Sequence, residues 1–281
     1  MENFLQNIPL YISPIAFQIG FFSVGWYPLM YLIGLGVVFL LLIYRLKKKE
    51  NDNFSLLSLT NLKLQNFLVY SLWGVLLGGR FGYVLYDFSY FWQHPIEIIS
   101  PYDFQSGVWI GLYGMSFHGG LLGVIFTTWL FCRKNQFKFR DFSDFIIPAL
   151  PAGYFFGRLG NFFNLELFGK KTELFWGMNF GDGLLRHPTQ LYEALGEGIF
   201  LFIFLWLMRN ENIFKGRFLF IYLLGYGLIR FMIDFLRESD GIYEYIFNIF
   251  SWSQAFSLAM IIVGIGGLVL IKKSKNDKIN G

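Results

Sequence analysis

Four polar side chains stand at the end of an otherwise apolar run. The stretch GRLGNFFNLELFG covers residues 157–169 and contains Arg158, Asn161, Asn164 and Glu166. A charged side chain in hydrocarbon costs about 2.5–3.5 kcal/mol on insertion scales, so such residues are rare there and are functional by default. A guanidinium group matches the geometry of a phosphate. The stretch therefore predicts a site that binds an anion, with a phosphate as the leading ligand.

Three other apolar runs carry an ionisable side chain. Arg80 lies in GGRFGYVLY, His118 in GLYGMSFHGGLLGV, and Arg230 in YGLIRFMIDFLRESD. Arg230 and Asp234 are four residues apart on a predicted helix, so they could form a simple ion pair, or Asp234 could orient Arg230 toward an anion. An imidazole can transfer a proton near neutral pH, although a lone histidine in a membrane is as often a hydrogen-bonding strut. The sequence leaves these alternatives open.

A further polar stripe lies in RHPTQLYEALGEG. Gln190, Glu193 and Glu197 are spaced i, i+3, i+7 and share one face of a predicted helix. A polar stripe inside an apolar helix usually faces protein or water rather than lipid. His187 precedes the helix, where a role at the surface is equally consistent with its position.

The composition is that of a membrane protein that crosses the bilayer several times. Of 281 residues, 55% are hydrophobic, 15% are charged and 36 are phenylalanine, whereas a soluble domain carries about 25% charged residues. The single cysteine excludes an internal disulfide, and the three histidines have no metal-ligand spacing. We therefore expect no metal site and no nucleic-acid partner.

Hydropathy predicts an all-α fold with about seven transmembrane helices. A helix needs about 20 residues to cross the hydrocarbon, and the predicted spans are 25–44, 67–86, 108–132, 144–164, 190–208, 218–236 and 254–271. Most of the 23 lysines and arginines fall in 45–66, 133–143, 209–217 and 272–281. Because positive loops stay inside, the N-terminus is expected outside and the C-terminus in the cytoplasm. We expect one transmembrane domain, 1–271, with 165–189 in a small extracytoplasmic head, and a basic cytoplasmic tail, 272–281.

This topology places the three apolar-run arginines in the outer part of the membrane. Arg80, Arg158 and Arg230 each lie about six residues before the outer end of a span, at a shared depth of roughly 9 Å. Snorkelling to the headgroups would explain one such arginine, but three at one depth favour a shared anion site. Gly153, Gly157 and Gly160 form a stripe that we interpret as a surface for helix packing. A polar set confined to the outer half favours chemistry on a lipid headgroup over a permeation path.

Five segments in order along the chain resemble the bacterial prolipoprotein diacylglyceryl transferases. They are WYPLMYL, MSFHGGLLG, GRLGNFFNLELFG, RHPTQLYE and YGLIRFMIDFLR. The resemblance implies a multi-pass protein of the bacterial plasma (inner) membrane, with its active site toward the outer leaflet. It implies transfer of the diacylglyceryl group of phosphatidylglycerol to the lipobox cysteine thiol of preprolipoprotein signal peptides. The product is a thioether, glycerol 1-phosphate is released, no cofactor is needed, and this is the first step of lipoprotein maturation.

The resemblance also implies roles for individual residues. His118 is the candidate base for the thiol, and Arg230 is implicated in lipid binding and catalysis. Arg158, Asn161, Glu166 and Tyr27 would bind the lipid headgroup. Supporting positions are Asn164, Gly169, His187 and Asp234, the last standing where the family pattern would have glutamate.

Other functions remain open from the sequence. A second phospholipid-headgroup transferase with a different acceptor would need the same phosphate site. A transporter or channel for an anionic solute would need a polar route to the cytoplasm, which the sequence does not show. A purely structural membrane protein gives no reason for three arginines at one depth.

Overall fold

A computed structural model describes residues 4–20, 22–50, 56–100, 102–103, 108–109, 114–238, 245–246 and 250–277. These residues are mostly helical and divide into two compact units. The first unit contains Met1–Glu50 and Ser143–Gly281, and the second contains Asn51–Phe142. Within the described residues, the strands form four two-stranded antiparallel sheets, β1–β2, β3–β4, β5–β6 and β7–β8, so the expected all-α fold carries small hairpins as well.

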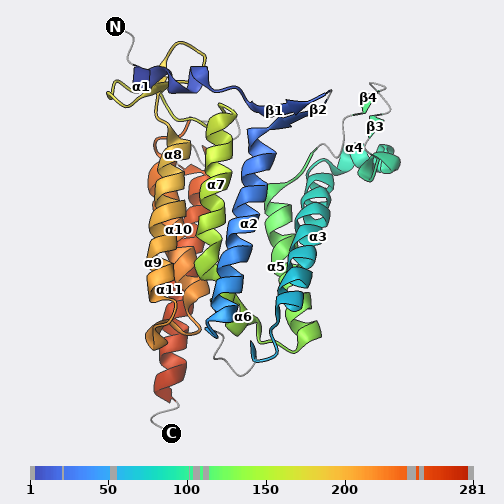
Figure 1. The fold of residues 1–281 in the computed structure, drawn as a ribbon, viewed down its shortest axis with the longest axis vertical. Coiled ribbons are helices and arrows are strands. Elements are labelled where there is room, and N and C mark those ends of the chain that lie inside the picture. Colours follow the sequence, from blue (N-terminus) through green and yellow to red (C-terminus); the bar gives the residue numbers. More distant parts are fainter. Residues whose placement is uncertain are drawn as a thin grey trace. The chain divides into compact units, whose positions relative to one another are not determined.

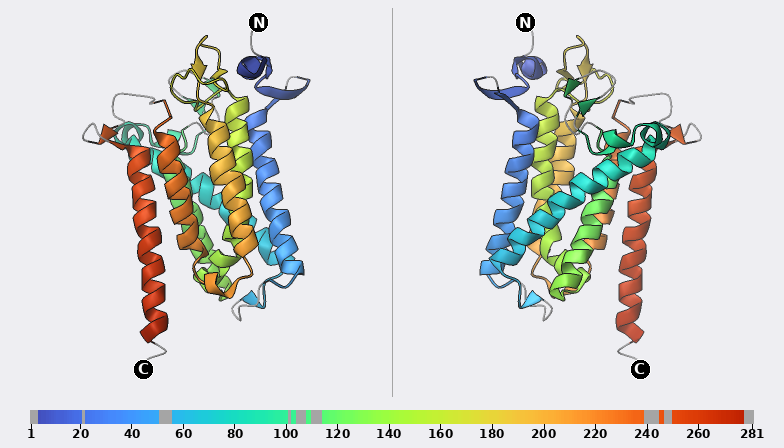
Figure 2. Two further views of the ribbon diagram at one scale, coloured as in Figure 1. Left: turned by 90° about the vertical axis from the view of Figure 1, so that its left-hand side faces the viewer. Right: turned by 90° about the vertical axis from the view of Figure 1, so that its right-hand side faces the viewer.

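The first unit is built on long helices that run side by side (Figures 1 and 2). Its amino-terminal part contains α1 (Phe4–Asn7), η1 (Ile8–Tyr11), β1 (Ile15–Ile19), β2 (Phe22–Gly25) and α2 (Trp26–Lys47). The helix α6 (Phe139–Ile146) begins in the second unit and, from Ser143, belongs to the first. It leads into η4 (Ile147–Ala149) and α7 (Leu150–Phe163), followed by β5 (Met178–Asn179) and β6 (Leu185–Arg186). The remaining elements are α8 (Thr189–Glu193), η5 (Ala194–Phe200), α9 (Leu201–Met208), η6 (Asn212–Phe214), α10 (Phe218–Asp234), β7 (Tyr245–Ile246), β8 (Phe250–Ser251) and α11 (Trp252–Asp277).

The elements α8, η5 and α9 form one continuous helix beside α7 and α10 (Figure 1). Its middle section, η5, is a π-helix of seven residues. Such wide turns are uncommon and occur frequently at functional sites. The polar stripe predicted from the sequence lies here, and Gln190, Glu193 and Glu197 are all 0% exposed. The expectation that this stripe faces protein is confirmed.

Glycines bring α2 and α7 into close contact. A Cβ added at Gly34 of α2 would lie 2.8 Å from the carbonyl oxygen of Gly153, and one added at Gly160 would lie 3.3 Å from the ring of Tyr27. Small residues allow membrane helices to approach this closely. The packing role predicted for the α7 glycines is confirmed, and it fixes the face of α7 that carries Arg158.

A buried ion-pair network ties α2 to the chain at the ends of α6 and α9. Arg45 is 3% exposed. Its Nε donates to Oε2 of Glu50 at 3.1 Å and its guanidinium group donates to the backbone oxygen of Asp144, also at 3.1 Å. Arg209 binds the same Glu50 at 3.0 Å. These contacts lie at the opposite helix ends from the polar stripe of α8.

The second unit contains α3 (Asn61–Tyr86), α4 (Phe88–Gln93), η3 (Pro95–Ile98), β3 (Tyr102–Asp103), β4 (Val108–Trp109) and α5 (Phe117–Asn135). Glycines on α3 and α5 face one another over several turns. A Cβ at Gly78 would lie 2.8 Å from the Cα of Gly123, and one at Gly82 would lie 2.8 Å from the Cα of Gly119. The two backbones therefore meet without side chains between them.

We expect Gly123→Ala to destabilise this unit, whereas Gly120→Ala should not. The added methyl at position 123 would overlap the backbone of Gly74, but at position 120 its closest neighbour would be 3.5 Å away. Overpacking of this kind costs about 1–3 kcal/mol. Thermal unfolding in detergent would compare the two variants, and equal melting temperatures would contradict the packing described here.

Each predicted span overlaps a helical segment, and the largest differences concern two of the spans. The span expected at 108–132 begins only at Phe117, because Val108–Trp109 is a strand. The span expected at 144–164 is interrupted by η4, which contains Pro148. Within the described residues, four helices are long and apolar enough to cross a membrane, namely Trp26–Lys47, Asn61–Tyr86, Thr189–Met208 and Trp252–Lys272. Seven crossings and the orientation of the termini stay predictions.

Candidate active site

Glu193 stands at the centre of a buried cluster of arginines in the first unit. Its carboxylate is 0% exposed and its Oε2 lies 2.8 Å from Nε of Arg158. Its Oε1 accepts a hydrogen bond from Arg230 and lies 3.6 Å from the guanidinium group of Arg237. One carboxylate on α8 thus bridges arginines from α7, α10 and the residues after α10.

Arg158 makes further contacts on its own helix. Its Nε donates to the Tyr154 hydroxyl at 2.7 Å, and its guanidinium carbon lies 4.8 Å from the centre of that ring. Its amino group donates to Oδ1 of Asn161 at 3.2 Å, and Nδ2 of Asn161 donates to Oε1 of Glu166 at 2.8 Å. Three of the residues predicted from the 157–169 stretch are therefore linked in one chain of hydrogen bonds.

A second buried carboxylate, Glu197, lies one turn beyond Glu193. It is 0% exposed and accepts a hydrogen bond from the hydroxyl of Tyr154. That hydroxyl lies 3.4 Å from the hydroxyl of Tyr226 on α10. Among the described residues, Oε1 of Glu197 has no hydrogen-bond partner. Glu197 thus contacts the cluster through a tyrosine rather than through an arginine.

Arg230 is held from the side opposite Glu193 by Asp234 and Ser253. Nε of Arg230 lies 3.1 Å from Oδ1 of Asp234 and 3.3 Å from Oγ of Ser253. The Ser253 hydroxyl donates to Oδ2 of Asp234 at 2.6 Å. Arg230 and Asp234 form the ion pair that was one of the two alternatives from the sequence, and a serine from α11 contacts both residues.

The cluster combines three guanidinium groups with three buried carboxylates. A buried ion pair is costly to desolvate, so it contributes stability only where both partners keep good contacts. Arg158 and Arg237 are the most exposed of the three arginines, with side chains 15% and 18% exposed, against 9% for Arg230. An arriving anion would reach Arg158 and Arg237 first. Snorkelling does not describe Arg158 or Arg230, because buried carboxylates hold both.

The loop after α7 is fastened over the cluster by side chains of α8. Gln190 donates to the backbone oxygen of Glu166 at 2.6 Å, and Thr189 donates to that of Leu167 at 2.9 Å. Leu165 and Leu167 have φ of 56° and 59°, a left-handed conformation that is uncommon for residues other than glycine. Asn164 is the C-cap residue of α7. These contacts place the Glu166 side chain beside Asn161.

Gly169 and His187 join this loop to the end of α10. The backbone N–H of Gly169 donates to the carbonyl of His187 at 2.8 Å, and Gly169 pairs with Arg237 in an antiparallel bridge. A side chain at Gly169 would overlap the carbonyl of Leu236. Close packing, and not a left-handed backbone, therefore requires glycine at this position. Burial lowers the pKa of His187, whose Nδ1 lies 3.2 Å from the Tyr192 hydroxyl.

Gly169→Ala should lower activity because the added methyl must push the 165–169 loop away from Leu236. Overpacking against backbone costs about 1–3 kcal/mol, and the displaced loop carries Glu166. Gly181→Ala, between β5 and β6, is unsuitable as a control, since Gly181 has φ of 108°. Gly36→Ala on α2 is a better one, because a Cβ there meets nothing within 4 Å. Rates of the reaction that the sequence predicts would be compared in the two folded variants, and equal rates would contradict this.

The remaining predicted residues lie on α2 and in the second unit. The Tyr27 hydroxyl donates to Tyr31 at 3.0 Å, and the Tyr27 ring faces Gly160 on α7. His118 and Arg80 belong to the second unit. His118 is an exposed residue in the first turn of α5. Arg80 donates to the backbone carbonyls of Ile98, at 2.7 Å, and Gly114, at 3.3 Å.

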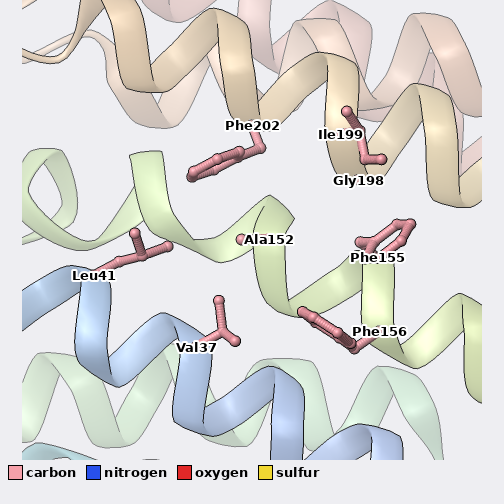
Figure 3. A pocket seen from close by; sticks show the side chains of 8 residues that line it. All are labelled: Val37, Leu41, Ala152, Phe155, Phe156, Gly198, Ile199 and Phe202. Atoms are coloured by element: carbon pink, nitrogen blue, oxygen red, sulfur yellow. The ribbon is translucent and has the colours of Figure 1, made fainter.

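An apolar cavity lies further along α7, between α2 and the η5–α9 helix (Figure 3). Its volume is about 310 Å³. It is lined by Val37, Leu41, Ala152, Phe155, Phe156, Gly198, Ile199 and Phe202. Side chains of this kind suit hydrocarbon rather than a polar group.

Within the described part of the chain, no group of three histidine, cysteine or acidic residues could hold a metal ion.

The predicted site residues did not include Glu193, Glu197 and Arg237 of the cluster, or Tyr154 and Ser253, which bind its arginines. Glu193 was identified only as part of a buried stripe, although its spacing from Gln190 and Glu197 was the available signal. Tyr154 lies one helical turn before Arg158, and that i, i+4 spacing could have indicated it. Ser253 has no local signal, because its partners lie on another helix.

Comparison with known proteins finds relatives along almost the whole chain. Residues 14–270 match the family model for prolipoprotein diacylglyceryl transferase. The phosphatidylglycerol–prolipoprotein diacylglyceryl transferase of Chlorobaculum tepidum is 42% identical over 274 residues, which are 95% of this chain and 93% of that protein. The enzyme of the same name from Campylobacter hominis is 38% identical over 280 residues, 98% of this chain and 97% of that protein. The one from Bordetella avium is 43% identical over 262 residues, 92% of this chain and 93% of that protein.

Proposed function

This chain belongs to the prolipoprotein diacylglyceryl transferase family, and we propose that the arginine cluster around Glu193 is its active site. The chain transfers a diacylglyceryl group from phosphatidylglycerol to prolipoproteins. The transfer is the first step of lipoprotein maturation. The observation that carries the proposal is the bridging of Arg158 and Arg230 by one buried carboxylate, beside the signature stretch at 157–169.

Phosphatidylglycerol presents one phosphate diester, and Arg158 is the residue best placed to bind it. Its side chain is partly exposed while Tyr154 and Asn161 fix its direction. Charge-assisted hydrogen bonds from a guanidinium group to a phosphate are roughly twice as strong as neutral ones. Glu166, bound to Asn161, would position the glycerol hydroxyls of the headgroup. Tyr27, on the α2 face that packs on α7, would complete the lipid site.

The proposed reaction is a displacement at the glyceryl carbon that carries the phosphate ester. The sulfur of the lipobox cysteine forms a bond to that carbon, and the carbon–oxygen bond breaks. The electron pair of the broken bond stays with the phosphate, which leaves as glycerol 1-phosphate. Arg158 and Arg230 would stabilise the charge that develops on this leaving group, the term that is usually largest in such sites.

The thiol must lose its proton during this step. A free cysteine has a pKa of about 8.5, so it is mostly protonated at neutral pH. His118 could accept the proton as a general base, or the field of the arginines could favour the thiolate. Both routes give the same products, but only the first needs the imidazole of His118.

We place this reaction at the outer leaflet of the bacterial plasma membrane. The distribution of lysine and arginine supports this topology, with seven crossings, the N-terminus outside and the C-terminus inside. Residues 165–189 would then form part of a small extracytoplasmic head, where preprolipoprotein signal peptides with a lipobox cysteine become accessible.

The proposed donor, acceptor and bond changes are tested by supplying labelled phosphatidylglycerol and two peptides. A lipobox peptide with cysteine should gain the diacylglyceryl mass, while glycerol phosphate is released in equal amount. The same peptide with serine should gain nothing. Transfer to the serine peptide, or release of free phosphatidic acid, would point to another headgroup transferase.

A further inference from the structure

Ser253 lies between two charged residues of the candidate site, although it stands on a separate helix. Its Oγ accepts from Nε of Arg230 at 3.3 Å and donates to Oδ2 of Asp234 at 2.6 Å. The hydroxyl is therefore used in both directions, as donor and as acceptor. Ser253 belongs to the first turn of α11 and is separated from Asp234 by the residues that lead into that helix.

The direction of the Arg230 N–H makes this serine more than a neighbour. Oδ1 of Asp234 is 3.1 Å from Nε of Arg230, but it has no hydrogen-bond partner among the described residues. The hydrogen of Nε is aligned with the oxygen of Ser253 instead. Asp234 therefore acts on Arg230 as a nearby charge, and its hydrogen-bonded connection to that arginine runs through the serine hydroxyl.

The same arrangement occurs at the other arginine of the cluster. Nε of Arg158 donates to the Tyr154 hydroxyl, and that hydroxyl donates to Glu197. In both cases the order is guanidinium, hydroxyl, carboxylate. Glu193 contacts Arg158 at this same Nε and accepts from a different nitrogen of Arg230, so each guanidinium group has more than one partner.

The start of α11 is itself fastened, which fixes where the serine hydroxyl lies. The backbone N–H of Gln254 donates to Oγ of Ser251 at 3.1 Å, and the N–H of Ser251 donates to the Gln254 side chain at 3.0 Å. This reciprocal pair is a capping box. Ser253 stands inside it, so its position follows from the helix start rather than from chance contact.

We propose that Ser253 is a positioning residue for the transferase reaction. Its hydroxyl links Asp234 to Arg230 by hydrogen bonds and so keeps that guanidinium group directed at the phosphate. The proposal depends on the function assigned above. The serine should affect the rate of the chemical step rather than lipid binding. Arg230 is already paired with carboxylates before the substrate binds, and it would stabilise the leaving group only as negative charge develops on it.

The test compares Ser253→Ala with Ser253→Thr and with Ser257→Ala. Ser257 lies one turn further along α11, and its hydroxyl donates to the backbone oxygen of Ser253 at 2.9 Å. Ser257→Ala therefore also removes one serine hydroxyl from α11, but not the hydroxyl that contacts Arg230. Ser253→Ala should lower kcat by about tenfold, the size of one charge-assisted hydrogen bond, with KM for phosphatidylglycerol nearly unchanged. Ser253→Thr keeps the hydroxyl and should restore most of the rate, and Ser257→Ala should behave as wild type.

A double variant shows whether the serine acts through Asp234. Adding Ser253→Ala to Asp234→Asn should cost much less than the tenfold seen in the wild-type background, since contacts in one network are not additive. A wild-type rate in Ser253→Ala, an equal loss in Ser257→Ala, or independent multiplication of the two effects would overturn the proposal.

Failure of the function and failure of this inference give different results. If wild type makes no product from phosphatidylglycerol and a lipobox peptide, the assigned function fails. The serine is then tested by the melting temperature of the purified protein, which should fall in Ser253→Ala but not in Ser253→Thr or Ser257→Ala, because only Ser253→Ala removes the donor to Oδ2 of Asp234. Equal melting temperatures in wild type and the three single variants would overturn the positioning role as well.

Discussion

Replacing Arg158 with lysine should reduce the transferase rate by about 10² to 10³-fold, the loss typical when one donor to a developing charge is removed. Lysine keeps the positive charge but loses the planar fork. It cannot reach Tyr154, Asn161 and Glu193 together, as the guanidinium group of Arg158 does. Initial rates with phosphatidylglycerol and a lipobox peptide would measure the change.

The matched control for this substitution is Arg209→Lys. Arg209 is also a partly buried arginine paired with a glutamate, Glu50, but it lies at the other end of the same unit. It should keep a rate within a few-fold of wild type. If Arg158→Lys and Arg209→Lys lose activity equally, the loss reflects general destabilisation, and Arg158 has no special part in the reaction.

Replacing Glu193 with glutamine should lower both stability and activity. The change removes the negative charge shared by Arg158, Arg230 and Arg237 and places an amide N–H₂ among cations. Breaking a buried ion pair by removing one partner costs about 3–5 kcal/mol. Because Arg158 and Arg230 would also lose the carboxylate that both contact, we expect the rate to fall by at least about 10² in the protein that remains folded. Melting temperature and initial rate would be measured on the same preparation.

Glu197→Gln is the comparison for Glu193→Gln, since both side chains are fully buried and lie one turn apart. The described contacts of Glu197 are with a tyrosine hydroxyl, and a glutamine oxygen can still accept that bond. Its stability and rate should change far less. A larger loss at Glu197 than at Glu193 would contradict the central place of Glu193 in the cluster.

The local parts of the site could be predicted from the sequence. Arg158, Asn161 and Glu166 lie in nine residues, and the helix period alone places the first two near each other. The same holds for Arg230 and Asp234, which are four residues apart and pair as expected. The stripe of α8 was recognised by its spacing, and its complete burial follows from the cost of exposing carboxylates to hydrocarbon.

The remaining parts depend on contacts between helices, which spacing does not encode. Glu193 pairs with arginines of α7 and α10 because glycines allow these helices to approach closely. No pattern within α8 indicates these ion pairs. Ser253 reaches Arg230 only because α11 returns alongside α10. The late start of α5 and the break at Pro148 were missed because hydropathy averages over such local features. Arg80 donates to backbone carbonyls in its own unit, which no charge pattern indicates.

The most direct test of the account is a single assay on purified protein with phosphatidylglycerol and a lipobox peptide, wild type beside Arg158→Ala. Mass spectrometry would detect the thioether product, and released glycerol phosphate would be measured in parallel. We expect product from wild type and almost none from the folded variant. Equal product from both would contradict the placement of the active site at the Glu193 cluster, and no product from well-folded wild type would contradict the assigned function.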